Sequence, residues 1–286
     1  MKLKPNVETF LGCDCAYEAA RMVLFGAPFD STTSFRPGTR FASKAIRQDS
    51  WGLETYSPYQ DADILDAGCM DAGDLELCFG DTEGTVAQIQ AFYGDILADG
   101  KLPLMIGGEH LVTLGAVRAA AERYPELCVI HFDAHTDLRD AYLGAKLSHA
   151  TVLRRIHELV GDGRIFQFGI RSGEKFEFEF AKEHTTLQKF NLDGLAEALD
   201  CIGERPVYFT LDLDILDPSV FPGTGTPEPG GVTFMELLEA VLQVAGKANI
   251  VGCDVNELAP NYDPSGASTA VACKVVRELI IALGTK

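Results

Sequence analysis

The sequence has no apolar run that approaches the roughly 18–20 residues a membrane-spanning helix needs. Its first residues, Met1 to Glu8, lack the apolar core of a secretory signal. Basic residues are few, because 24 Lys and Arg stand against 42 Asp and Glu and leave a formal net charge of −18. This balance argues against nucleic-acid binding through a basic face. We therefore expect a cytoplasmic protein with neither a nucleic acid nor a membrane as its partner.

The eight cysteines are too scattered for a disulfide framework. Several lie in apolar runs, as Cys128 does, which is typical of small buried hydrophobic residues. Cys13 and Cys15 form a lone C-x-C pair, which is only a weak indication of a metal site. The 47% of apolar residues suffices for a sizeable core. Because no linker, repeat or low-complexity tract interrupts the chain, we expect a single domain over residues 1–286.

Strand-like apolar runs alternate with segments of helical periodicity along the chain. Such alternation predicts an α/β fold, with a mostly parallel sheet covered by helices on both faces. Predicted strands cover residues 22–26, 63–66, 102–106, 127–132, 164–169, 207–211 and 250–255. Predicted helices cover residues 82–98, 111–123, 151–160, 192–202, 234–245 and 268–283.

Six residues of metal-binding type follow three of these strands: His110, then Asp133, His135 and Asp137, then Asp212 and Asp214. In the last two stretches they alternate with other residues, and an extended chain directs alternate side chains to the same side. Ligands bind at the carboxyl ends of strands in open α/β sheets. Four carboxylates meeting at one point would repel each other unless cations lay between them. The pattern predicts a two-metal site, which is typical of hydrolases. The alternative is that Asp133 and Asp212 are ordinary turn or cap residues.

Other segments could complete such a site. The Gly- and Pro-rich stretch 217–231 and the stretch 28–40 are predicted to form loop walls. His149 is either a residue near a helix start or a proton shuttle. Glu257 is either a surface carboxylate or a partner for a cationic substrate. His131 lies inside a strand, where a core histidine is favoured over a ligand, and His157 and His184 receive no role.

These motifs are similar to those of the ureohydrolases, the family of arginases and agmatinases. The shared stretches are Gly107 to His110, Asp133 to Asp137, Ser148-His149 and Asp212 to Pro218. Residues 35–41, 53–57 and 222–231 resemble the agmatinase branch in particular. The similarity extends from about residue 20 to the C-terminus, and its metal motifs are more specific than any indication of the substrate.

The resemblance implies an arginase-like three-layer α/β/α fold with two Mn²⁺ ions per chain. Asp133 and Asp212 would bridge the ions, with His110 and Asp137 on one ion and His135 and Asp214 on the other. A site rich in carboxylate oxygens and free of thiolate also favours a hard ion such as Mn²⁺. A metal-bridging hydroxide would then attack the guanidinium carbon and release urea. The implied catalytic residues are His149, Glu257 and Asp137, with His149 relaying a proton and Glu257 holding the guanidinium.

The substrate is less well determined. The resemblance to the agmatinase branch implies hydrolysis of agmatine to putrescine, a step of polyamine biosynthesis. The segment 138–147 lacks the asparagine expected of arginases, and Ala150 replaces an expected glycine. Arg139 and Asp140 are candidate substrate-binding residues, which leaves guanidinobutyrate, carboxyaminopropylagmatine and arginine as alternatives. A formimidoylglutamase, a deacetylase with one metal, and a non-catalytic metal-binding regulator are further alternatives. The family also implies a homo-oligomer, either a trimer or a hexamer.

Overall fold

The computed structural model describes residues 8–78 and 80–284. Residues 1–7, for which we predicted no secretory signal, lie outside this part of the chain. The centre of the molecule is a sheet of eight parallel strands in the order β4-β1-β5-β10-β9-β6-β7-β8. In chain order they are β1 (Met22–Gly26), β4 (Cys69–Asp74), β5 (Leu102–Ile106), β6 (Cys128–Phe132), β7 (Ile165–Ile170), β8 (Thr186–Lys189), β9 (Pro206–Asp212) and β10 (Asn249–Asn256).

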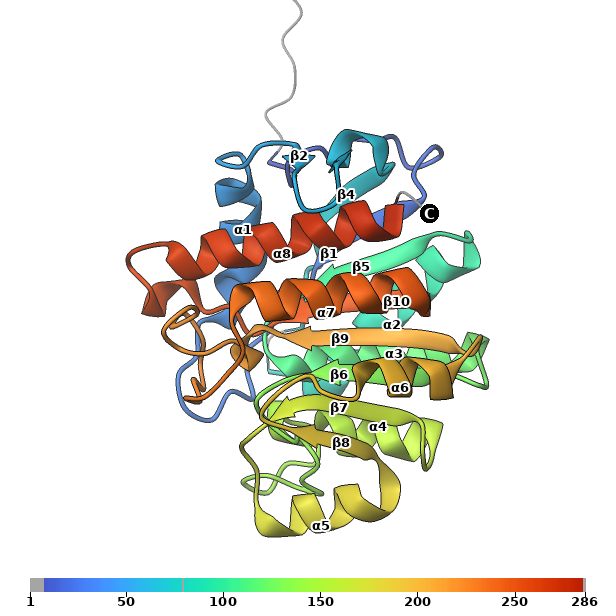
Figure 1. Ribbon diagram of the computed structural model, residues 1–286, viewed down its shortest axis with the longest axis vertical. Coiled ribbons are helices and arrows are strands. Elements are labelled where there is room, and N and C mark those ends of the chain that lie inside the picture. The colour runs from blue at the N-terminus through green and yellow to red at the C-terminus, as the bar shows by residue number, and fades with distance from the viewer. Residues whose placement is uncertain (1–7, 79, 285–286) are drawn as a thin grey trace, which may run out of the picture.

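Helices cover both faces of this sheet, which gives the three layers expected from the sequence (Figure 1). In the view of Figure 1, α6, α7 and α8 lie in front of the sheet and α2, α3 and α4 behind it, with α5 beside the edge strand β8. The bounds are α1 (Ala42–Ser50), α2 (Thr82–Ala98), α3 (Thr113–Arg123), α4 (Val152–Val160), α5 (Lys175–His184), α6 (Leu195–Ile202), α7 (Phe234–Lys247) and α8 (Ala267–Gly284).

The sheet separates two hydrophobic cores, because alternate residues of each strand point to opposite faces. In β1, Leu24 packs into the core beneath α7 and α8, whereas Val23 and Phe25 pack into the core beneath α2 and α3. Within the described residues no helix is long and apolar enough to cross a membrane. All eight cysteines are free, as the sequence predicted.

One predicted strand is wrong. Residues 63–66 do not form a strand: a two-residue strand β3 (Ala62–Asp63) pairs with β2 (Tyr56–Ser57), and a 3₁₀ helix follows over Ile64–Asp66. The physical reason is that the Asp63 carboxylate accepts a hydrogen bond from the backbone N–H of Leu65 and so caps a turn. The second strand of the central sheet is instead β4, at the sheet edge, which no sequence pattern predicted.

The register of the central strands places their ends in one row. Val255 lies beside both Ile106 and Leu211, and Leu211 lies beside Phe132. The next residues along each strand therefore leave the sheet at the same edge. This row brings together the segments that carry the candidate ligands.

Candidate metal centre

His110 reaches the sheet edge through a close backbone contact. Gly108, two positions before it, faces the carbonyl oxygen of Phe29 so closely that a Cβ atom at Gly108 would lie 2.0 Å from that oxygen. The N–H of Glu109 donates to that same carbonyl at 2.8 Å. Glycine is therefore required where the two segments meet. The 3₁₀ helix His110–Val112 begins directly afterwards, with the His110 side chain buried.

The imidazole of His110 has one satisfied nitrogen and one unsatisfied nitrogen. Its Nε2 lies 2.8 Å from the hydroxyl of Thr210, which itself donates to Asp254 at 2.6 Å. Thr210 must then accept from Nε2–H, so the lone pair of His110 is on Nδ1. This Nδ1 is buried and has no hydrogen-bond partner. It lies 3.0 Å from Asp133 Oδ2, and 3.3 Å from an oxygen of Asp137 and of Asp212.

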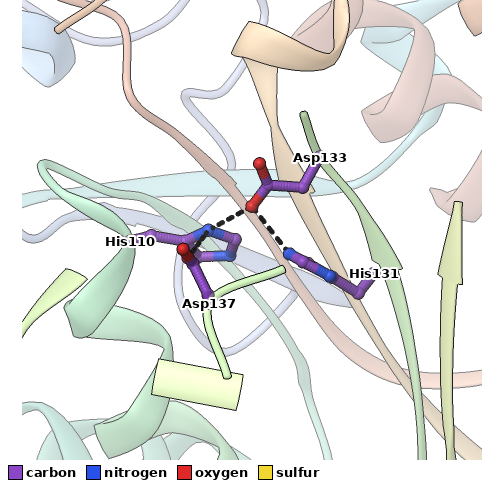
Figure 2. Close-up of side chains that lie close together, drawn as sticks. All are labelled: His110, His131, Asp133 and Asp137. Carbon is purple, nitrogen blue, oxygen red and sulfur yellow. Dashed lines mark hydrogen bonds and ion pairs between the residues drawn. The ribbon is translucent and has the colours of Figure 1, made fainter. Parts of the chain in front are cut away.

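Asp133 lies between the two predicted histidine ligands. Its Oδ2 faces His110, and its Oδ1 is 3.4 Å from Nδ1 of His135. His131 also points at Asp133, with Nε2 2.7 Å from Oδ2, as Figure 2 shows. The amide of Gln167 donates to the carbonyl of Thr136 at 2.9 Å and lies 3.1 Å from Nδ1 of His131. That network leaves the proton of His131 on Nε2, so His131 donates to Asp133 and orients the carboxylate.

The carboxylates of Asp212, at the end of β9, and Asp214, just after it, complete the group from the other side. Oδ2 of Asp214 lies 3.0 Å from Nδ1 of His135, and the backbone N–H of Ala134 donates to its Oδ1 at 3.1 Å. Asp212 accepts from the backbone N–H of Asp214 at 2.8 Å and presents its other oxygen to His110. The structure thus brings all six predicted ligands together. Two sets of donor atoms are each compact enough to hold an ion: one comes from His110, His131, Asp133 and Asp137, and the other from Asp133, His135 and Asp214.

The electrostatics of this group call for added positive charge. Burial, together with the charge of Asp133, raises the pKa of Asp137 to about 6. Burial and the carboxylates of Asp214 and Asp133 likewise raise the pKa of Asp212 above its usual range. The unpaired Nδ1 of His110 offers a lone pair at the same point. Buried carboxylates and an orphaned imidazole nitrogen that face each other fit divalent cations.

A cleft of about 180 Å³ opens onto these residues. His135 and Asp137 lie in its wall, and both predicted loop walls contribute a residue, Ser34 from one and Thr226 from the other. His149 also lines the cleft, with Nε2 3.1 Å from the Ser34 hydroxyl. Burial, and then the charges of His135 and His110, lower the pKa of His149 to about 4. Its ring is therefore neutral near pH 7.

Glu109 ties His149 to the metal-ligand segment, and sequence reasoning gave it no role. Its buried carboxylate accepts from the backbone N–H of Thr32 at 2.8 Å and from the hydroxyls of Thr32 and Thr33. The hydroxyl of Thr32 in turn accepts from the backbone N–H of His149 at 3.1 Å. Burial raises the pKa of Glu109 to about 7. Its place directly before His110 was the one available signal.

Glu257 is buried beside the cluster, not on the surface. Its Oε1 accepts from the backbone N–H of His110 at 2.7 Å. Its Oε2 accepts no hydrogen bond from residues 8–78 or 80–284, which leaves that oxygen open to a ligand. Burial and the neighbouring Glu109 raise the pKa of Glu257 well above its usual range, so a cation nearby would be strongly favoured.

The two predicted substrate-binding residues occupy different places. Arg139 lines the cleft, with its guanidinium 4.4 Å from the ring centre of Tyr142 and within 3.6 Å of the carboxylates of Glu174 and Glu177. Asp140 is absent from the cleft wall, and its exposed carboxylate accepts from Arg155 at 2.8 Å. Arg139 and Asp140 therefore do not act as a pair at the cleft.

Several residues that line or support the cleft could not be identified from the sequence, because they lie far from any motif. Glu177 is buried and accepts from the hydroxyl of Thr136 at 2.6 Å and from the N–H of Leu138 at 3.0 Å, so it braces both sides of Asp137. Arg171 donates to the carbonyls of Asp214 and Glu228, which holds the 217–231 loop against the 3₁₀ helix that follows β9. The carboxylate of Glu228 accepts from Ser172 at 3.0 Å.

Comparison with known proteins identifies the family. Residues 20–282 match the model of the arginase family. The chain is 45% identical to an agmatinase of Bacillus subtilis over 96% of both chains. It superposes with a TM-score of 0.89 on the agmatine ureohydrolase of Thermoplasma volcanium, at 35% identity over 97% of this chain and 94% of that one. The proclavaminate amidinohydrolase of Streptomyces clavuligerus gives a TM-score of 0.86 at 33% identity, over 98% of both chains.

The chain belongs to the arginase family, and it is an amidinohydrolase. The family resemblance predicted from Gly107–His110, Asp133–Asp137 and Asp212–Pro218 is thereby confirmed, as is the arginase-like fold. The buried His/Asp cluster is a site that could bind metal.

Proposed function

We propose that the chain hydrolyses agmatine to putrescine and urea, with two Mn²⁺ ions held by His110, Asp133, His135, Asp137, Asp212 and Asp214. The observation that carries this proposal is the buried cluster of four carboxylates and two imidazoles at the cleft, with Glu257 beside it. The agmatinases that resemble this chain over nearly its whole length support the choice of substrate.

The ligand set favours Mn²⁺ because carboxylate oxygens outnumber imidazoles and no thiolate is present. Asp133 presents one oxygen to each histidine, which suits it to bridge two ions. When bound, two such ions would polarise a water molecule and supply the nucleophile near neutral pH. His131 and Ala134 act behind the ligands, since each donates a hydrogen bond to a carboxylate and fixes its direction.

Glu257 is suited to orient the guanidinium group. A carboxylate and a guanidinium match as two parallel hydrogen bonds, and burial strengthens the pairing. The N–H of His110 fixes the position of Oε1. A guanidinium held there would lie beside the cluster, and Asp214 and Glu109 add negative charge around it.

His149 is suited to move a proton to the leaving amine. Its ring is neutral near pH 7, so Nε2 can take up a proton and pass it on. Ser34 holds this nitrogen at 3.1 Å, and Thr32 holds the backbone of His149 in place. The amine must leave protonated, because an alkylamide anion is too basic to depart in water.

The charge at the cleft mouth favours a substrate with a cationic tail. Arg139 brings one positive charge, but Glu174 and Glu177 lie against it and Glu228 adds a third carboxylate near His135. The balance is negative, which attracts the terminal ammonium of agmatine. Arg139 could instead receive a carboxylate, which would favour guanidinobutyrate or a carboxylated agmatine.

The decisive experiment measures urea release from purified protein with Mn²⁺ and a matched panel of substrates. The panel contains agmatine, guanidinobutyrate, arginine and carboxyaminopropylagmatine, with formamide release from formimidoylglutamate measured in parallel. We expect urea, with agmatine giving the highest kcat/KM. A higher kcat/KM for a carboxylate-bearing substrate would move the assignment to that compound, and a lack of urea from every compound would overturn it.

The oligomer implied by the family resemblance, a trimer or a hexamer, stays a prediction. Light scattering coupled to size-exclusion chromatography tests it, because each alternative gives a distinct multiple of the 31.0 kDa chain mass.

A further inference from the structure

Two histidines that carried no signal in the sequence meet at one aspartate on the surface, outside the cleft described above. Nε2 of His157 lies 2.7 Å from Oδ1 of Asp162, and Nδ1 of His184 lies 2.7 Å from the same oxygen. His157 belongs to the last turn of α4, Asp162 to the turn that follows, and His184 ends α5. The three candidate ligand atoms lie within 4.8 Å of one another.

We propose that His157, Asp162 and His184 form a separate surface site for a transition-metal dication of the zinc class. Imidazole nitrogens suit Zn²⁺, Ni²⁺ and Cu²⁺, and two of them with one carboxylate leave coordination positions open for water. This donor set contrasts with the carboxylate-rich centre, which favours Mn²⁺. The two sites are therefore expected to select different ions.

The geometry needs little adjustment to hold an ion. Tetrahedral zinc with nitrogen and oxygen ligands at roughly 2.0–2.2 Å sets neighbouring ligand atoms about 3.3 Å apart. The two N···O distances of 2.7 Å must open by a few tenths of an ångström. Asp162 can move by that amount, because 68% of its side chain is exposed. Each imidazole would then carry its proton on the nitrogen that does not face the ion.

The backbone around the three ligands is already fixed by hydrogen bonds. The N–H of Gly161 donates to the carbonyl of His157 at 2.8 Å, and the N–H of Gly163 donates to the carbonyl of His184 at 2.9 Å. Both glycines have positive φ angles, 82° and 68°, which the tight turn around Asp162 requires. The turn thus holds the end of α4 and the end of α5 together.

The two rings are held in place by an aromatic neighbour. Phe180 stacks on His184 with ring centres 4.1 Å apart and meets His157 edge-on at 5.0 Å. On Phe180 lies the guanidinium of Arg154, 3.8 Å from the ring centre. Rings restrained in this way lose little freedom on binding an ion, which favours affinity. The side chains of His157 and His184 remain 16% and 29% exposed, so an ion can reach them from solvent.

An ion at this place would join two helices whose other ends support the catalytic centre. The first N–H groups of α4, from Leu153 and Arg154, donate to the carbonyl of Asp137. In the first turn of α5, Glu177 accepts from Thr136 and Leu138. Linking the distal ends of α4 and α5 therefore braces the segment that carries Asp137.

The test compares zinc uptake by four proteins that all carry the Mn²⁺-loaded centre: the wild type, His184→Gln, Asp162→Asn and the control Glu158→Gln. Glu158 is an exposed neighbour of His157, so its variant removes a nearby charge without removing a ligand. ZnCl₂ is the probe, bound zinc and manganese are measured by elemental analysis after equilibrium dialysis, and urea release serves as a folding control. Zinc that enters the centre displaces manganese equally in all four proteins.

We expect the wild type and Glu158→Gln to bind one zinc ion more per chain than the other two variants. Loss of one ligand should weaken that extra ion by at least about tenfold. We also expect zinc to raise the Tm of the wild type and of Glu158→Gln more than that of His184→Gln. Equal zinc binding by all four proteins, or an equal loss in Glu158→Gln, would overturn the proposal. Should His184→Gln fail to fold, the comparison with Asp162→Asn alone decides, because Asp162 is a surface residue.

Discussion

The carboxylate of Glu257 is joined to the backbone of His110 by a hydrogen bond of 2.7 Å. This bond fixes the position of Glu257, the proposed substrate anchor, relative to His110, a proposed metal ligand, although the two are 147 positions apart in the chain. Glu257 also has a φ angle of 67°, a conformation that few residues other than glycine adopt. The chain accepts this backbone conformation at the point where the guanidinium is proposed to bind.

Replacing Glu257 by Gln should separate these two functions. Gln can still accept from the N–H of His110, but it cannot pair as an anion with a guanidinium. We expect kcat/KM for agmatine to fall by about 100-fold, as for loss of a buried charged hydrogen bond. Manganese content and Tm should stay at the wild-type level. A variant that loses its manganese instead would show that Glu257 acts through the metal centre.

Replacing His149 by Phe should lower turnover while leaving the metals in place. A positioned acid–base group contributes about 10²–10⁴-fold to the rate, and we expect kcat to fall within that range with little change in KM. Ser34→Ala is the matched control, because it removes only the hydroxyl that contacts Nε2 of His149. Its effect should be several-fold at most. Equal losses in both variants would contradict a proton-transfer role for His149.

The charge of Arg139 should influence the choice of substrate. Arg139→Gln removes the positive charge that is paired with Glu174 and Glu177. We expect the ratio of kcat/KM for agmatine over guanidinobutyrate to rise by about threefold, the size expected of a partly exposed charge pair. The control is Arg164→Gln, a surface arginine paired with Glu126. A fall in the ratio would mean that Arg139 does not receive carboxylates.

Removal of the metals should abolish urea release and lower stability together. The carboxylates of Asp133, Asp137, Asp212 and Asp214 repel one another without cations between them. Dialysis against a chelator is expected to remove the activity and lower the Tm, and added Mn²⁺ should restore both. At a free ion concentration 100 times the Kd, one bound ion adds about 2.7 kcal/mol to the free energy of unfolding. Retention of full activity by the metal-free protein would exclude the proposed centre.

Asp263 should make the free energy of unfolding depend on pH in the acidic range. Hydrogen bonds from Ser265 and Ser268 lower the pKa of its carboxylate to about 2. The unfolded value is about 3.9, so the stabilisation is present above about pH 4 and is lost as the pH falls towards 2. We expect Asp263→Asn to reduce the free energy of unfolding by about 1 kcal/mol at pH 6, because a neutral amide oxygen replaces a charged acceptor in these hydrogen bonds.

Urea denaturation at pH 6 and pH 2.5 measures this effect. The difference between wild type and Asp263→Asn should shrink at the lower pH, because the wild-type carboxyl is then partly protonated. Glu239→Gln on the exposed face of α7 serves as a control for general acid effects. A difference that stays constant between the two pH values would contradict the assignment.

The periodicity of apolar residues predicted the interior of the fold well, because buried parallel strands and amphipathic helices have distinctive patterns of apolar residues in the sequence. Helix α2 and strand β5 begin and end where the sequence predicted. The elements at the edges of the sheet have weaker sequence patterns. Strand β4, with the sequence CMDAGD, contains no β-branched residue and owes its place to pairing with β1. Helix α5 shows the strand-like alternation KFEFEF, yet the capping box of Glu174 and Glu177 starts a helix.

Some residues of the candidate site could be predicted from the sequence, whereas others could not. Its six predicted ligands were visible because they follow strands and two of the three stretches repeat with a period of two. Glu109, Glu177 and Arg171 could not be identified, because the contacts that place them at the site join residues between 39 and 77 positions apart, which only the fold makes neighbours. The cluster of His157, Asp162 and His184 escaped for the same reason, since it joins two helices that are adjacent only in space.

The order of the strands also sets when the centre can form during synthesis. Strand β10, the last to be made, lies between β5, which carries His110 at its end, and β9, which carries Asp212. A nascent chain that stops before residue 249 has no strand to place between them, so His110 and Asp212 cannot come into contact as they do in the full sheet. The proposed metal centre is therefore expected to form only after β10 has been made, and a ribosome-bound fragment lacking β10 should bind manganese no better than its unfolded segments do.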